Sequence, residues 1–177
     1  FQLDFKIEVG DTTMTPAGLL AAVDEHREEL KDISSLEGEL VLRLDGNDRV
    51  GIEYSDPVLR LTGGWLRKLP WVIAGDTETV ALRNSEHCYA FIPAGNGVEI
   101  SFFEGDEAEI TEYLVDPTNV RLDDFVEASI ALGKTMVSLV RAVDPSLLDG
   151  NEDCKDLVAS LDEATAAWHE HQIHQRR

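Results

Sequence analysis

The stretch from 98 to 125 combines two alternating runs, an acidic turn between them and the start of a helix. In the first run, Val98, Ile100 and Phe102 alternate with polar neighbours, which is the period of a strand with one buried face. A second run, 109–115, follows the turn. The stretch therefore predicts an antiparallel hairpin with a negatively charged tip.

The negative charge of this stretch limits which partners the protein can bind. From Glu99 to Glu127, just past its end, ten carboxylates and one basic residue, Arg121, give a local net charge of −9, within a chain of net charge −20. The ten are Glu99, Glu104, Asp106, Glu107, Glu109, Glu112, Asp116, Asp123, Asp124 and Glu127. Such a surface repels nucleic acid and anionic membranes, and it attracts basic partners. The alternative is that the charge only keeps the protein soluble.

Length and cysteine content indicate an ordinary globular protein. The 177 residues fit one domain, 1–177, which is long enough to bury a core without disulfides. Cys88 and Cys154 are the only cysteines, so no disulfide framework is expected. Reduced thiols and the lack of a secretory signal predict a cytoplasmic protein. No apolar run reaches the roughly 18 residues that a membrane span needs, so no membrane partner is expected.

Period-two runs bounded by turn residues recur along the chain. Strands are predicted at 2–9, 38–45, 49–55, 78–83, 87–93, 98–104 and 109–115, with a possible short strand at 58–61. Gly46-Asn47-Asp48 is predicted as a hairpin turn, and Asp116-Pro117 is predicted to end the last strand. Short links favour pairing between neighbouring strands. We therefore expect an α+β fold built on one antiparallel meander sheet of six to seven strands.

Helices are expected at both ends of the chain. Thr15 and Pro16 form a start signal for a helix over 16–31. Two C-terminal helices follow the sheet, one from Asp123 to the Asp144-Pro145 stop and one from Asn151. These helices are expected on one face of the sheet. Phe103 lies on the polar face of its strand and is expected beneath a helix.

The segment from Trp65 to Ala74 is rich in apolar residues and follows Gly63-Gly64. Pro70 is expected to interrupt any helix there. One interpretation is an aromatic ligand pocket or an anchor for a partner, and a self-interface in an oligomer is a further alternative. The other, favoured by the usual burial of tryptophan, is a short helical turn that packs over one end of the sheet.

Catalytic and metal-binding signals are weak. The C-terminal run from His169 to His174 lacks the i, i+4 histidine pair of zinc proteases; His171 and His174 share a helix face, and a frayed helix end is the favoured interpretation. His87 and Cys88 are adjacent, so in a strand they point to opposite faces. The turn from Gly105 to Glu109 lacks the ligand order of a calcium loop. We therefore assign no catalytic residue, metal or cofactor, although a hydrolytic or ligand-binding enzyme with a carboxylate-lined cleft stays an alternative.

Three segments carry a resemblance: 97–105, then Glu112-Tyr113, then 122–125. They resemble segments of bacterial toxin-immunity proteins, which are encoded beside polymorphic or contact-dependent toxins. The resemblance implies a cytoplasmic inhibitor that binds a cognate toxin domain. The acidic surface predicts that this domain is basic and that inhibition works by occlusion, and a monomer or weak dimer is expected. The residues expected at the contact are Glu104, Asp106, Glu107, Glu109 and Glu112, with Tyr113 or Trp65 as an aromatic anchor.

Overall fold

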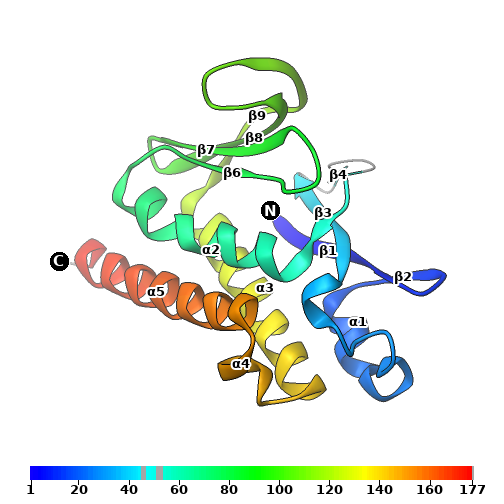
Figure 1. Ribbon diagram of the computed structural model, residues 1–177. Coiled ribbons are helices and arrows are strands. Elements are labelled where there is room, and N and C mark those ends of the chain that lie inside the picture. Colours follow the sequence, from blue (N-terminus) through cyan, green and yellow to red (C-terminus); the bar gives the residue numbers. More distant parts are fainter. Residues whose placement is uncertain (45–46, 51–53, 177) are drawn as a thin grey trace.

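The computed structural model describes residues 1–44, 47–50 and 54–176, which form two separate antiparallel sheets and a set of helices (Figure 1). The first sheet has the order β2-β1-β3-β4, and β5 pairs with the start of β3. Its strands are β1 (Gln2–Val9), β2 (Thr12–Met14), β3 (Glu37–Leu44), β4 (Asn47–Val50) and β5 (Asp56–Pro57). The second sheet has the order β6-β7-β8-β9. Its strands are β6 (Glu78–Ala81), β7 (His87–Ala94), β8 (Gly97–Gly105) and β9 (Ile110–Arg121).

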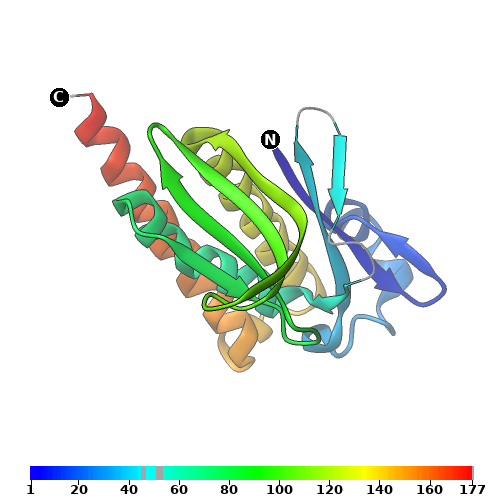
Figure 2. The ribbon, with the colours of Figure 1, turned by 90° about the horizontal axis from the view of Figure 1, so that it is seen from above.

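Helices cover one face of the second sheet and leave the other face to the surface (Figure 1). We call the covered side, where Tyr89 and Phe91 contact Trp65, the inner face, and the opposite side the outer face. The helices are α1 (Pro16–Ala21), α2 (Val58–Ala74), α3 (Leu122–Val143), α4 (Leu147–Gly150) and α5 (Glu152–Gln175), with 3₁₀ turns η1 (Val23–His26) and η2 (Ile33–Ser35). Seen from above, the two sheets stand next to each other (Figure 2).

The prediction of one six- to seven-stranded sheet is wrong, although the α+β class is confirmed. The sheet is divided because of α2, a helix of 17 residues in the region predicted as a short strand and a helical turn. Pro70 lies inside this helix, and a proline there removes one backbone hydrogen bond. Burial of Trp65, Leu66 and Leu69 on one face of α2 offsets that loss. The helix carries the chain away from the first sheet, so β6 starts a new one.

The N-terminal helix is shorter than predicted, whereas the predicted boundaries of the C-terminal helices at 144–145 and 151 are confirmed. Thr15 caps α1 by accepting a hydrogen bond from the backbone N–H of Gly18, at 3.0 Å. The helix predicted over 16–31 nevertheless ends at Ala21, because the charged run after Val23 offers no continuous apolar face. The stop at Asp144-Pro145 is confirmed, and so is the start at Asn151, whose side chain caps α5 by accepting from the N–H of Cys154.

The strand predictions are mostly confirmed, with a correction at the end of β9. Asp116-Pro117 does not end this strand, which runs on to Arg121. The pairing of β8 with β9 shifts its register between Ile100 and Phe102, and the proline falls in that irregularity. Since β9 is an edge strand, the missing N–H of Pro117 costs little. The predicted turn at 46–48 and strand at 49–55 lie partly outside the described residues.

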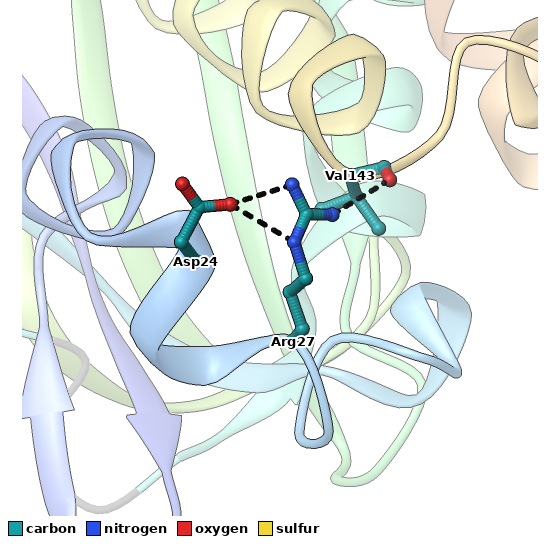
Figure 3. A network of polar contacts seen from close by, with 3 residues as sticks. All are labelled: Asp24, Arg27 and Val143. Carbon is teal, nitrogen blue, oxygen red and sulfur yellow. Dashed lines mark hydrogen bonds and ion pairs between the residues drawn. The ribbon is translucent and has the colours of Figure 1, made fainter.

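One apolar core joins both sheets to α2, α3 and α5. Trp65 lies at its centre, and its indole N–H donates a 2.9 Å hydrogen bond to Ser129 Oγ. Figure 3 shows a second link, in which Arg27 binds the Asp24 carboxylate and reaches the backbone carbonyl of Val143 at the end of α3. This contact fixes η1 against the end of the longer helix. No helix in the described part of the chain combines the length and apolar character of a membrane span.

Candidate partner-binding site

A short loop, 106–109, joins β8 to β9 and stands on the outer side of the second sheet (Figure 1). Asp106 shapes it, because its Oδ1 accepts from the backbone N–H groups of Ala108 (2.8 Å) and Glu109 (3.0 Å). Gly105 has a φ of 119°, and a Cβ there would lie 2.1 Å from the carbonyl oxygen of Glu109. Only glycine fits this approach. The loop therefore has a defined backbone shape.

The loop is attached to the far edge of the sheet through Glu107. The Thr79 hydroxyl on β6 donates a hydrogen bond to the Glu107 carboxylate, so the loop crosses above β7. Beneath it lies a small apolar cluster on the outer face, formed by Cys88, Ala90 and Phe103. Burial, followed by the charges of Glu107 and Asp106, raises the pKa of the Cys88 thiol.

Phe103, which was expected beneath a helix, is covered in another way. It is buried as predicted, with 1% of its surface exposed, but it packs with Cys88 and Ala90 on the outer face, which the helices of the described chain leave uncovered (Figure 1). Its ring packs edge-on against Tyr113 of β9, with 5.9 Å between the ring centroids. An apolar residue on the polar face of the strand is thus covered by the hairpin's own loop and partner strand.

The structure brings six of the seven predicted contact residues together at one end of the β8–β9 hairpin. We call the five carboxylates Glu104, Asp106, Glu107, Glu109 and Glu112 the acidic tip. Glu104 is half-buried and the other four are exposed. Tyr113 is 41% exposed beside them. Ile110, which the sequence reasoning missed, is 42% exposed at the start of β9, and its position next to the acidic turn was the only available signal.

The acidic tip contains a like-charge pair. Glu104 of β8 lies directly opposite Glu112 of β9 in the strand register. Among the residues the structure describes, no Lys, Arg or His side chain forms an ion pair with any carboxylate of the tip. Like charges directly opposite each other destabilise an antiparallel pair. The free protein thus carries local repulsion that a cationic ligand would relieve.

The other carboxylates of the −9 stretch lie elsewhere. Glu99 pairs with Asn119 near the opposite end of the hairpin, where Gly97 faces Arg121. Asp123 and Asp124 begin α3, and Asp123 accepts a 3.1 Å hydrogen bond from Arg121. The negative stretch is therefore divided in space, and only the acidic tip remains as a concentrated group.

Trp65, the alternative to Tyr113 as the expected aromatic anchor, is buried in the core. It is 3% exposed and makes ring contacts with Tyr89, Phe91 and Phe125. A partner cannot reach it on the surface, so its role is to pack the core. The exposed tryptophan of the same segment is Trp71, at 57%.

The histidines do not form a metal centre in the described part of the chain, where no group of three His, Cys, Asp or Glu side chains is arranged to hold an ion. The ring of His171 stacks on Trp168 at 5.3 Å, and His174 Nδ1 contacts the carbonyl of Glu170. His87 and Cys88 point to opposite faces, as their adjacency predicts. The ring of His87 stacks on Phe102, with 5.5 Å between the ring centroids, and lies tilted against Tyr54 at 3.8 Å.

A hollow of about 580 Å³ lies where the ends of α2 and α5 approach the start of α3. Its chemically active side chains are Arg121, Asp123, Glu127, His171 and Arg176. Asp123 is already paired with Arg121. The hollow can bind a polar ligand, but it brings together no nucleophile and base at hydrogen-bond distance.

Comparison with known proteins gives no match to a family model, to a curated protein or to a solved structure. The acidic tip and its neighbours therefore carry the functional argument alone.

Proposed function

We propose that this protein is a non-enzymatic binding protein of the toxin-immunity kind, which neutralises a basic toxin domain in the cytoplasm by binding and occluding it. The observation that carries the proposal is the unpaired acidic tip, with Glu104 opposite Glu112. A stability-driven sequence would place a cation at one of these positions. Departures from such local rules tend to lie at functional sites, where a partner supplies the missing charge.

The neighbourhood of the tip supports a protein partner rather than a simple cation. Tyr113 and Ile110 expose apolar area beside the carboxylates, as interface anchors do, and the charges around them give fast and oriented association. Asp106 and Glu107 are held in place by their own hydrogen bonds. A contact surface that is ordered before binding loses less conformational entropy when the partner arrives.

Charge reversal tests the proposal. The tagged protein is used to capture partners from a lysate of its native host, and the affinity of the recovered partner is measured by calorimetry at low and physiological salt. Glu109→Lys with Glu112→Lys is expected to weaken binding at least about 100-fold, because two attractions become repulsions. These positions are preferred to Glu107, whose carboxylate also holds the loop.

The matched control is Asp162→Lys with Glu163→Lys on the exposed side of α5, which changes the net charge by the same amount. This control is expected to retain wild-type affinity within about threefold at physiological salt, where distant charges are screened. Equal losses in the two double variants, or no loss in either, would contradict the proposed contact surface.

A further inference from the structure

A basic groove lies between α2, the strand β6 and the start of α5. It has a volume of about 460 Å³, and four of the fifteen lysines and arginines of the chain line it: Arg60, Arg67, Lys68 and Arg83. This volume is in the range of small-ligand sites. In a chain of net charge −20, the gathering of cations in one concave place needs an explanation.

The cations of α2 form a stripe along one side of the helix. Arg60 and Arg67 are seven positions apart, which brings them to one face with Gly64 between them, and Lys68 lies beside Arg67, about 100° further round the helix. A Cβ at Gly64 would meet only Val80 Cγ1, at 3.9 Å, so the floor of the groove is open. The sequence analysis missed this stripe because it predicted a possible short strand at 58–61 and only a helical turn after Gly63-Gly64, where the structure has one helix.

Two of the four cations are already engaged. Lys68 forms a 2.7 Å ion pair with Glu78, and Arg67 lies 3.6 Å from Asp156 of α5. In the described part of the chain, the guanidinium groups of Arg60 and Arg83 have no hydrogen-bond or ion-pair partner. Both are exposed at the groove. Two guanidinium groups are thus available to a ligand.

Three carboxylates also line the groove, and they differ in burial and in the groups that they contact. Asp56 is buried, and its Oδ1 accepts from the backbone N–H groups of Arg83 (2.8 Å) and Asn84 (2.9 Å). Asp156 faces Arg67, and Asp153 is half-buried in the first turn of α5. Burial raises the pKa of Asp56, and the charge of Arg60 is among the influences that oppose this effect. Asp56 therefore lies on the same side of the groove as Arg60 and Arg83, where its carboxylate is held by backbone N–H groups.

We propose that this groove binds an oxyanion, a phosphate or carboxylate group of a small molecule, with Arg60 and Arg83 as its principal ligands. Guanidinium groups bind both kinds of oxyanion with paired N–H donors. The negative field of the rest of the protein is screened over about 8 Å at physiological ionic strength, so the local cations decide binding there. The groove adjoins the acidic tip through Thr79, which lines the groove and donates a hydrogen bond to Glu107, but binding by Arg60 and Arg83 does not depend on the proposed inhibition.

Titration by NMR tests the site in the full chain. Sodium phosphate and sodium acetate are added in separate experiments at constant ionic strength, with sodium chloride as the blank, and backbone amide shifts are followed. Saturable shifts are expected at Val80, Arg83 and Asn84, with a dissociation constant in the millimolar range or tighter. Saturation by phosphate alone identifies a phosphoryl ligand, and saturation by acetate as well identifies the wider oxyanion class; both support the site.

Two double variants of equal net charge complete the test. Arg60→Gln with Arg83→Gln is expected to weaken binding at least about tenfold. The control, Lys134→Gln with Arg141→Gln on exposed positions of α3, is expected to bind as the wild type does. Amide spectra of both variants report whether the fold is retained. Non-saturable shifts in the wild type, or equal weakening in the two variants, would overturn the proposal.

Discussion

The Thr79 hydroxyl donates a hydrogen bond to the Glu107 carboxylate and so joins the loop after β8 to the opposite edge strand of its sheet. The two residues are 28 positions apart in the chain. Their contact holds part of the acidic tip in place and closes the loop over Cys88. One hydrogen bond thus connects the geometry of the candidate site to the burial of a thiol.

This connection makes Cys88 a reporter of loop opening. Thr79→Val keeps the side-chain shape and removes the donor, which is expected to cost about 1 kcal/mol of loop closure and to raise the labelling rate of Cys88 about fivefold. The rate is measured with a thiol reagent at pH 8 and peptide mapping. Cys154 is fully buried, and burial raises its pKa to about 11, so its labelling reports unfolding of the whole chain.

The control for this labelling experiment is Thr111→Val, the same substitution at an exposed position of β9 that has no side-chain hydrogen bond in the described structure. It is expected to leave the Cys88 rate unchanged. Equal rates in the Thr79 variant and the wild type would show that Glu107 does not hold the loop.

The like-charge pair of the hairpin predicts a conflict between stability and binding. Glu112→Gln removes one of two facing carboxylates and is expected to stabilise the free protein by about 0.5 kcal/mol. For a chain of this size the melting temperature should rise by about 1–2 °C. Glu163→Gln at an exposed position of α5 removes the same charge outside any strand pair, and it is expected to give a smaller rise. A fall in melting temperature for Glu112→Gln would contradict the repulsion.

Local patterns predicted the strands well, because an alternating run such as 2–9 depends only on which face it buries. The division into two sheets was not predictable in the same way. It depends on α2, where the intrinsic preference of Pro70 against a helix is overridden by burial of neighbouring side chains. The early end of α1 was also missed, because the start signal at Thr15 says nothing of where the helix ends, and the charged run after Val23 offers no continuous apolar face to extend it.

For the candidate site, charge density alone located the acidic tip, since six of the expected residues gather on one hairpin. Sequence could not choose between Tyr113 and Trp65, because the burial of an aromatic side chain depends on contacts with distant elements. It also missed the bond from Thr79 to Glu107 and the cations of α2, which only the folded chain brings to one groove.

Trp65 and Tyr113 are expected to separate core packing from partner contact. Trp65→Phe loses the hydrogen bond to Ser129 and some packing, so the free energy of unfolding is expected to fall by about 1–2 kcal/mol with partner affinity unchanged. Tyr113→Ala is expected to do the reverse, with a small effect on stability and a loss of affinity of about tenfold or more. Denaturant unfolding and calorimetry measure the two effects. If the folded Trp65→Phe protein bound its partner more weakly, Trp65 would belong to the contact surface, against this prediction.

Asp56 makes the folding stability depend on pH, and its burial decides the direction of that dependence. Burial raises its pKa, against the opposing effect of hydrogen bonds from the backbone N–H groups of Asn84 and Arg83. The folded chain therefore holds this proton more tightly than the unfolded chain does, whose pKa is about 3.9. The stabilising contribution is complete below that value and is lost as the pH rises through the folded pKa.

Asp56→Asn keeps an oxygen acceptor for the two N–H groups and removes the buried charge. Relative to the wild type, this variant is expected to gain stability as the pH rises from about 3.5 to 7, measured by urea unfolding at each pH. Asp162→Asn on the exposed side of α5 corrects for the loss of one charge from an acidic chain, and its difference from the wild type should change less with pH. A stability difference for Asp56→Asn that falls with rising pH would mean that the backbone hydrogen bonds outweigh burial, and that the carboxylate of Asp56 is stabilised in its charged form.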